Sequence, residues 1–309
     1  MSPEKKMRLD TDSDFEGDNT QVNKAVLVVT ECPYFGKETT VIVHPSSSPE
    51  NVTVEKNEAT IADKLLEIER KLATKITSMV FRGPVSYVYN PIDYAYAVHS
   101  KFVYKFCNSV KNVMFLGMNP GPWGMSQTGV PFGEVNIVRD WMGIIGDVGR
   151  PERENPSRPV MGFACKRIEV SGQRFWGLFK DLCGDPNNFF QDVIVYNYCP
   201  VAFMTESGKN ITPSELKVSE REALNTLCDE ALYDVLQLLN TNIIVAIGKF
   251  CEKRAESLVK TRGLDHIRIE CILHPSPRNA GAGNWKETIT KKLTDLDLMK
   301  YFTGISTCH

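Results

Sequence analysis

The sequence offers little that would support a disulfide framework, a metal site or a membrane span. Its nine cysteines include no C-x-x-C pair, which is a spacing typical of zinc and redox sites. Several cysteines lie inside apolar runs, as reduced cysteines of a protein core do, so we expect an intracellular protein without disulfide bonds. No apolar stretch approaches the roughly 20 residues that a membrane helix needs. We therefore expect no signal peptide, no membrane association and no zinc or iron–sulfur site.

Two common nucleotide-binding motifs are also missing. Glycine and proline are dense in residues 117–125 and 129–134, but this segment lacks the Gly-Lys-Ser/Thr ending of a P-loop. It also lacks the G-x-G-x-x-G pattern of a dinucleotide fingerprint. Such density favours a rigid loop whose backbone can approach a ligand closely. On spacing alone, a purely structural turn with Asn119 at positive φ is an equal alternative.

Charge is distributed unevenly along the chain. Residues 1–59 carry 6 Lys or Arg and 11 Asp or Glu, a net −5, so the whole-chain charge of −2 leaves residues 60–309 with a net +3. We expect residues 1–59 to form a disordered acidic tail and residues 60–309 to form one folded domain. The basic cluster in residues 3–10 resembles a nuclear-localisation signal and predicts a nuclear protein, with a stray charge cluster as the alternative. The mildly basic domain is compatible with nucleic acid.

Beyond residue 60, apolar strand patterns alternate with helical patterns. The expected strands are continuous apolar runs, as in buried parallel sheets, at residues 113–118, 193–196, 242–247 and 267–273. The expected helices lie at residues 61–76, 135–145, 172–183, 219–239, 249–261 and from 285 onward. This alternation predicts an α/β fold of three layers, α/β/α, with a central four-stranded parallel sheet.

Two residue pairs have the spacing of a capping box, in which two side chains bond the first backbone N–H groups of a helix. One pair is Thr60 with Asp63, and the other is Ser219 with Glu222. We expect each pair to start a helix, the first at residue 61 and the second running to about Leu239.

Three predicted strands end at a polar residue suited to recognising a nucleobase: Asn119, Asn197 and His274. Because ligands of open α/β sheets bind at the carboxyl ends of the strands, we expect these three side chains to lie together. Two amides and one imidazole make a neutral hydrogen-bonding group without a carboxylate at its centre. This favours a pocket that binds a base over one that hydrolyses with paired acids. Taken alone, His274 is more typical of a satisfied histidine at a strand end.

A stiff segment follows His274. It consists of Pro275, Ser276, Pro277, Arg278 and Asn279. Two prolines one residue apart restrict the backbone, and Arg278 adds a charge at the tip. A rigid basic tip beside a pocket suits insertion into a DNA duplex, because little ordering entropy is lost on binding. We therefore expect these five residues to contact DNA.

Together these segments resemble a known family. Gly-Met-Asn-Pro-Gly-Pro at 117–122 and His-Pro-Ser-Pro-Arg-Asn at 274–279 are similar to the two signature motifs of the single-strand-selective monofunctional uracil-DNA glycosylases. Segments 129–134, 170–177 and 197–200 match in order as well. The mismatch-specific branch of the superfamily shares the first Asn but has no His-Pro-Ser-Pro. The common uracil glycosylases have His-Pro-Ser-Pro but an Asp-Pro-Tyr type of first motif.

The resemblance implies a uracil-DNA glycosylase-like fold and hydrolysis of the N-glycosidic bond of deoxyuridine in DNA. The product would be an abasic site, which starts base-excision repair. The implied substrates are single- and double-stranded DNA containing uracil or a 5-substituted uracil such as 5-hydroxymethyluracil, with the base flipped out of the stack. The resemblance implies that no cofactor is needed, and we expect a monomer.

The resemblance also implies a role for each motif residue. Phe132 would stack on the uracil ring, and Asn197 would pair with its edge. His274 would donate a hydrogen bond to O2 as charge grows there, and Asn119 would hold the attacking water. The backbone of two further residues would line the base pocket: Met118 and Gly121. No lysine lies within the motifs to form a Schiff base, which agrees with a monofunctional enzyme.

Three other interpretations compete with this one. A mismatch-type uracil/thymine glycosylase would act on G·T pairs and lack His274. A catalytically idle DNA-binding relative would retain the fold but have no need of Asn119, Phe132, Asn197 and His274 together. A flavodoxin-like protein that binds a small molecule would explain the sheet but not Arg278.

Overall fold

The computed structural model describes residues 27–32, 35–42, 58–277 and 284–302. Two compact units divide the chain, residues 1–58 and residues 59–309. In the first unit, β1 (Leu27–Cys32) pairs antiparallel with β2 (Phe35–Ile42). The basic cluster at residues 3–10, on which the expectation of a nuclear protein depends, lies outside the described residues, as do Arg278 and Asn279.

A parallel four-stranded sheet forms the centre of the second unit, as predicted. Its strands are β4 (Val113–Gly117), β5 (Val193–Asn197), β8 (Ile243–Ile247) and β9 (Arg268–Ile272), in the order β5-β4-β8-β9. Every residue of β4, β5 and β8 is buried. Helices cover both faces of such a sheet, and strands buried on both faces need continuous apolar sequence, as these three have.

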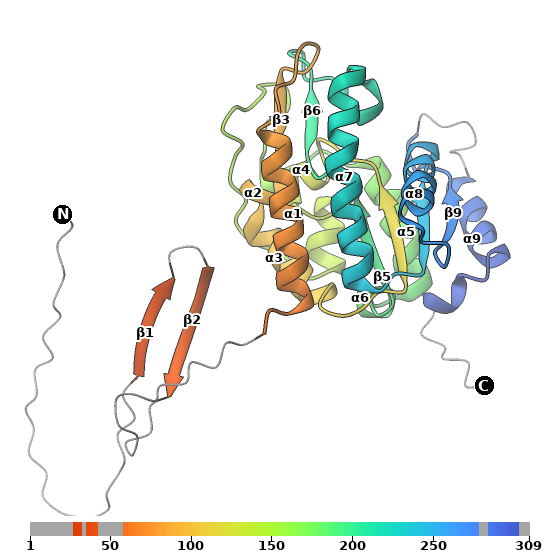
Figure 1. Ribbon diagram of the computed structural model, residues 1–309, viewed down its shortest axis with the longest axis horizontal. Coiled ribbons are helices and arrows are strands. Elements are labelled where there is room, and N and C mark those ends of the chain that lie inside the picture. Colours follow the sequence, from red (N-terminus) through yellow and green to blue (C-terminus); the bar gives the residue numbers. More distant parts are fainter. Residues whose placement is uncertain (1–26, 33–34, 43–57, 278–283, 303–309) are drawn as a thin grey trace, which may run out of the picture. The chain divides into compact units, whose positions relative to one another are not determined.

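The two faces of the sheet are covered by different helices (Figure 1). Phe115 of β4 packs on Phe179 of α5 (Val170–Cys183) at 5.1 Å between ring centroids and on Phe189 of α6 (Pro186–Phe190) at 6.1 Å. Tyr196, which pairs with the next β4 residue, lies on the other face near α1 (Ile61–Thr77) and α7 (Val218–Leu239). Helices α1 and α7 pack side by side. The three-layer α/β/α prediction is therefore confirmed.

The predicted helix starts have mixed outcomes. Thr60 and Asp63 form the expected capping box of α1. The box predicted at Ser219 and Glu222 is wrong, because α7 begins at Val218 without a side-chain cap. The observed box lies seven residues earlier, at Thr212 and Glu215, and caps the short turn Pro213–Glu215.

The helix predicted over residues 135–145 is also wrong in extent. The helical segment begins at residue 135 as predicted but ends at residue 141, with a π-helical turn at Ile137–Trp141. Glu134 accepts the backbone N–H of Ile137 at 3.1 Å, which starts the turn. Gly143 has φ 62°, a left-handed conformation that stops it from continuing.

Several short elements had no clear signal in the sequence. A second sheet of order β3-β6-β7 is antiparallel. Its strands are β3 (Tyr87–Tyr89), β6 (Ala202–Met204) and β7 (Asn210–Ile211). Helices α2 (Pro91–Tyr94), α3 (Tyr96–Phe106) and α4 (Met125–Thr128) were not predicted either. Two further helices, α8 (Lys249–Arg262) and α9 (Trp285–Asp295), confirm the helices predicted at residues 249–261 and from 285 onward. The described residues also form 3-10 turns at Gly162–Ala164 and Met299–Tyr301.

Within the described ranges, no helix is both long and apolar enough to cross a membrane. The same ranges contain no cluster of three or more His, Cys, Asp or Glu side chains that could hold a metal. In the second unit, the seven described cysteines are free thiols, and six of them are buried. The exception is Cys271, which is half-buried.

A buried His99–Glu69 pair joins α3 to α1. The His99 ring bonds the Glu69 carboxylate through Nε2 at 2.7 Å and the Gly129 carbonyl through Nδ1 at 2.8 Å. Burial acts to lower the pKa of His99, but the facing carboxylate and the two hydrogen bonds outweigh it, so the pKa is raised overall. Since both partners of the ring accept hydrogen bonds, we infer a protonated His99 that holds the turn beginning at Gly129.

Replacing Glu69 by Gln is expected to change how stability depends on pH. A raised folded-state pKa means that the pair stabilises the native state fully below the ordinary value of 6.5, and this contribution is lost as the pH rises through the folded pKa. Glu69→Gln should therefore be less stable than wild type near pH 6, by about 1–3 kcal/mol. The deficit should shrink as the pH rises, which urea unfolding at several pH values measures.

Glu67→Gln is the matched control on the same helix. It removes an exposed partner of Arg70 and should change the free energy of unfolding by less than about 1 kcal/mol. A Glu69→Gln deficit of equal size at every pH would contradict an ionised His99.

Candidate functional site

The site is built where β4 and β5 end side by side. Gly117 and Asn197 are paired in the parallel register. Beyond this pair the backbones stay joined, since Tyr198 N–H donates to the Gly117 carbonyl and Cys199 N–H donates to the Met118 carbonyl, both at 2.9 Å. These bonds fix the start of the glycine-rich loop against the chain that follows Asn197. The Met118 carbonyl is therefore engaged with the protein backbone.

Gly117 is the point at which two predicted site residues meet. A Cβ at Gly117 would lie 2.4 Å from Asn197 Oδ1 and 2.9 Å from Phe132 Cε2. Both distances are too short for real atoms, so only glycine fits here. Phe132 and Asn197 lie 65 positions apart in the sequence, and the fold brings them together over this glycine.

Phe132 is held in an uncommon backbone conformation. Its φ is 53°, a genuine outlier for a bulky residue, and such strain persists only where the surroundings impose it. One face of its ring stacks on Phe175, with centroids 5.0 Å apart and planes at 19°. The neighbouring Pro131 carbonyl accepts the Trp176 indole N–H at 3.1 Å. On Gly172 a Cβ would come within 2.1 Å of the Phe132 carbonyl oxygen, so the Phe132 backbone lies directly on α5.

The amide of Asn197 is buried and has a protein partner. Its Nδ2 donates to Met125 Sδ at 3.1 Å, and only 6% of the residue is exposed. A thioether sulfur accepts hydrogen bonds but cannot donate them. The contact therefore assigns the NH2 group to the Met125 side and the carbonyl oxygen to the Gly117 side, and it disfavours the flipped amide.

His274 follows β9 and approaches Phe132, with ring centroids 6.1 Å apart. Burial lowers the pKa of His274 to about 4, so the imidazole is neutral near pH 7. Its Nδ1 accepts the backbone N–H of Ser276 at 3.1 Å. The neutral ring therefore carries its proton on Nε2, which makes that atom a donor.

Two side chains anchor the segment that carries His274. The Trp285 indole N–H donates to the Leu273 carbonyl at 2.8 Å, and Arg174 Nη1 donates to the Pro275 carbonyl at 3.3 Å. The segment is thus tied on one side to α9 and on the other to α5. Of the predicted DNA contacts, Pro275 is buried, Ser276 half-buried and Pro277 exposed.

Asn119 and Gly121 lie in the loop after β4, and both are half-buried. Asn119 Nδ2 is 3.5 Å from the Pro120 carbonyl oxygen, at the limit of a hydrogen bond. Beside Gly121 the space is filled by Glu169, whose Oε2 would lie 2.8 Å from a Cβ there. Burial raises the pKa of Glu169, although its carboxylate accepts the backbone N–H groups of Ser171 and Trp123. Glu169 therefore joins this loop to the start of α5.

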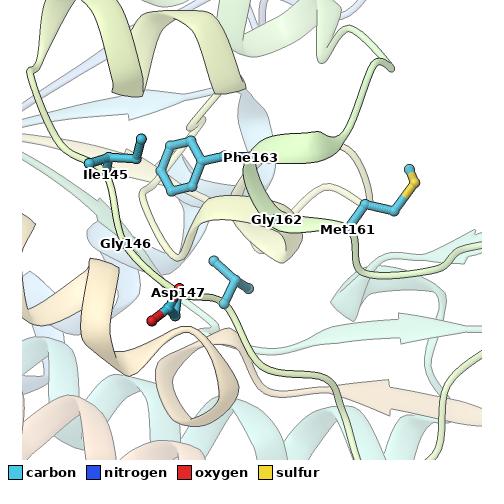
Figure 2. A pocket seen from close by; sticks show the side chains of 7 residues that line it. Ile145, Gly146, Asp147, Met161, Gly162 and Phe163 are labelled. Carbon is cyan, nitrogen blue, oxygen red and sulfur yellow. The ribbon is translucent and has the colours of Figure 1, made fainter.

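A surface cavity of about 460 Å³ lies elsewhere on the same unit. Figure 2 shows it between the segments 145–148 and 161–163. Asp147 is its one titratable lining residue, and no predicted site residue lines it. We therefore assign the functional site to the strand ends, where the polar and aromatic groups converge.

Known proteins with the same sequence pattern identify the family. Residues 104–296 match the family model described as the uracil DNA glycosylase superfamily. The chain is 44% identical over 261 residues to the single-strand selective monofunctional uracil-DNA glycosylase of Rattus norvegicus, covering 84% of this chain and 93% of that one. It is 43% identical over 245 residues to the Bos taurus protein of the same name, covering 79% and 90%. The chain belongs to the single-strand selective monofunctional uracil-DNA glycosylases. The predicted resemblance is confirmed, and the chain is a hydrolase of N-glycosyl bonds.

Solved structures agree with the fold of this family. The crystal structure of wild-type Pedobacter heparinus SMUG2 matches with a TM-score of 0.56 at 17% identity, covering 77% of this chain and 98% of that one. At this identity the match concerns the fold alone. It supports the uracil-DNA glycosylase-like arrangement predicted for the domain.

Several residues that shape this glycosylase site were not predicted from the sequence. They are Met125, Glu169, Gly172, Arg174 and Trp285. Gly172 and Arg174 lie inside the matched segment 170–177, and Met125 ends the glycine-rich segment 117–125, so their positions carried a signal but their contacts did not. Arg174 and Trp285 act across 101 and 12 residues of chain, and no periodicity indicates such contacts.

Gly172→Ala is expected to disturb the Phe132 turn. The added Cβ would meet the Phe132 carbonyl oxygen at 2.1 Å, so either the turn or α5 must shift. The free energy of unfolding should fall by about 1–3 kcal/mol, as overpacking usually costs. The excision rate should fall by more than the loss of folded protein explains, because the Phe132 ring is displaced. Chemical unfolding and single-turnover excision rates measure the two effects.

Gly177→Ala provides the control on the same helix. Nothing lies within 4 Å of its Cβ position, so alanine should stabilise α5 by about 0.5–1 kcal/mol and leave activity unchanged. Equal behaviour of the two variants would refute the role given to Gly172.

Proposed function

We propose that this protein excises uracil and 5-hydroxymethyluracil from single- and double-stranded DNA by hydrolysing the N-glycosidic bond. The product is an abasic site, which starts base-excision repair. The observation that carries the proposal is the meeting of Asn197 and Phe132 over Gly117, with the Asn197 amide oriented by Met125. The printed names of the curated relatives describe single-strand selective uracil-DNA glycosylases, which supports the same activity here.

Base recognition falls to Phe132 and Asn197. Phe175 covers one face of the Phe132 ring, and we assign the other face to the flipped uracil, a stack worth about 1–3 kcal/mol. With one hydrogen of its NH2 group on Met125, Asn197 donates the other to uracil O4 and accepts N3–H at Oδ1. Cytosine presents the reverse pattern. A fixed amide therefore leaves buried polar groups unmatched when cytosine enters, which costs binding.

His274 stabilises the leaving group. Departure of the base puts negative charge on uracil and positive charge on the sugar, as in the oxocarbenium-like transition states of glycosidases. The neutral imidazole donates from Nε2 to O2 as that charge grows. A preorganised donor of this kind is worth about 2.7–4 kcal/mol. With a pKa of about 4, His274 acts as a hydrogen-bond donor across neutral pH without changing charge.

Asn119 holds the attacking water. An amide does not take up a proton at neutral pH, so Asn119 positions the nucleophile rather than activating it as a general base. The reaction then depends mainly on departure of the base. No lysine lies within the motifs, so no Schiff base forms and the DNA strand is not cut.

Action on duplex DNA depends on the segment after His274. Flipping a paired base costs a few kcal/mol, and a stiff element that fills the vacated space reduces this cost. Pro275 is held by Arg174, which gives the segment a fixed base. Arg278 and Asn279, which would form its tip, lie outside the described residues.

Release of uracil from a labelled single-stranded oligonucleotide, with chelator present, tests the proposal. Wild-type protein should leave a site that is cleaved only after alkali. His274→Leu should bind the same DNA but lose about 10²–10³ in rate, since one preorganised donor is removed. Base release is also measured from duplex DNA and from DNA that contains 5-hydroxymethyluracil. No base release in any arm would refute the proposed function, and an unchanged His274→Leu rate would refute the role of His274.

Met125→Leu should weaken selection against cytosine. Leucine fills similar space but cannot accept the Asn197 N–H, so the amide can flip. The ratio of uracil to cytosine excision should fall about five- to tenfold, the worth of one hydrogen bond. Met142→Leu, at another fully buried methionine, is the control and should leave the ratio unchanged. An unchanged ratio in Met125→Leu would show that another contact orients Asn197.

A further inference from the structure

Two arginines gather on Trp123, in the loop that carries Asn119. The guanidinium carbon of Arg158 lies 5.4 Å from the centre of the indole, and that of Arg167 lies 5.3 Å away. We call these three residues the Trp123 cluster. None of the roles proposed above for base recognition or bond breaking uses it.

The two charges of the Trp123 cluster are not neutralised within the described part of the chain. Arg158 Nη1 donates to the Ser157 carbonyl at 2.8 Å, and its Nε has no hydrogen-bond partner among the described residues. Within that same part, neither arginine forms an ion pair, whereas Arg254 binds Asp229 and Arg268 binds Glu270. Two guanidiniums without an ion-pair partner, both held at one indole, form a site that favours anions.

Buried polar side chains fix the segments that carry the cluster. Gln127 is fully buried and bonds three backbone groups: Nε2 donates to the Pro122 carbonyl at 2.9 Å and the Pro159 carbonyl at 3.0 Å, and Oε1 accepts from Met161 N–H at 2.8 Å. These bonds join the residue before Trp123 to the residue after Arg158. The cluster is therefore placed by the protein interior rather than by chance contacts of surface side chains.

Glu169 makes the second connection. It accepts the backbone N–H of Trp123 and lies two residues after Arg167. It is also the carboxyl group nearest in the chain to Arg167, but its oxygens accept the backbone N–H groups of Ser171 and Trp123. Since Glu169 also packs against Gly121, the cluster lies at the rim of the loop that holds Asn119.

We propose that the Trp123 cluster binds phosphates of the DNA strand that carries the target base, beside the flipped nucleotide. This inference rests on the proposed function. An arginine stacked on an aromatic ring uses its flat face and keeps its N–H edge for oxygen acceptors, and phosphate matches that edge. Trp123 thus aligns two phosphate-binding groups next to the excision site, where the strand must pass.

The salt dependence of DNA binding tests this assignment. The probe is a labelled single-stranded oligonucleotide with a tetrahydrofuran abasic analogue, and anisotropy gives Kd at several salt concentrations. Each phosphate contact on a single strand contributes about 0.7 to the slope of log Kd against log salt. Arg158→Gln and Arg167→Gln should each lower the slope by about 0.7, and the double variant by about 1.4. When the salt concentration is raised fourfold, the Kd of the double variant should therefore rise about sevenfold less than the Kd of wild type.

The control is another arginine that lies over an aromatic ring, but outside the Trp123 cluster. Arg262 lies over the Tyr233 ring at 4.9 Å, on α8. Arg262→Gln removes the same charge and a similar stacked pair, and it should leave the slope unchanged. Trp123→Leu keeps both arginines but removes their support, so affinity at fixed salt should fall about two- to fivefold, the worth of a surface cation–π contact.

The possible results separate this inference from the proposed function. Lower slopes in the cluster variants but not in Arg262→Gln support the inference, even if wild type released no base. Equal slopes in all variants would overturn it while leaving excision intact. Competition by a polyglutamate peptide as strong as that by unlabelled oligonucleotide would also overturn it, because the cluster would then accept any polyanion.

Discussion

The parallel register of β4 and β5 places Gly117 directly beside Asn197, and the absence of a side chain at Gly117 lets Asn197 and Phe132 share the space above it. Every other feature of the site depends on this close approach. Phe132 reaches it only by adopting φ 53°, and that conformation requires the bare surface of α5 at Gly172. The buried ion pair of His99 and Glu69 holds the start of the same turn at Gly129. Residues outside the proposed base contacts therefore determine where the Phe132 ring lies.

The electrostatics of the site change from its interior to its rim. The interior is neutral: Asn119 and Asn197 are amides, and burial keeps His274 uncharged by lowering its pKa to about 4. A neutral pocket accepts a neutral base without a large desolvation penalty, and it leaves a single donor to act on charge that develops later. At the rim, Arg158 and Arg167 stack on Trp123 and present positive charge. This division suits a polyanionic strand that must deliver an uncharged base.

Long apolar runs made the centre of the sheet predictable, because the buried strands β4, β5 and β8 need continuous hydrophobic sequence, whereas the edge strand β9 is only partly buried. Phe132 lies beside Asn197 over Gly117 and near His274, whereas no hydrogen bond joins Asn119 to Asn197 or His274 in the described part of the chain, and the roles of these residues stay predictions. The small sheet was missed because strands such as Tyr87–Tyr89 are too short to show a period. The box at Ser219 failed because Thr212 and Glu215 already cap the preceding turn. Met125 was missed because its contact with Asn197 spans 72 residues, and only folding brings that sulfur to the amide.

The proposed function requires uracil to bind between Phe132, Asn197 and His274. A crystal structure of the protein with single-stranded DNA bearing a tetrahydrofuran abasic analogue and with free uracil tests this directly. We expect uracil stacked on Phe132, with the Asn197 NH2 group at O4 and His274 Nε2 at O2. Uracil bound elsewhere, or bound here with the Asn197 amide flipped away from Met125, would contradict it.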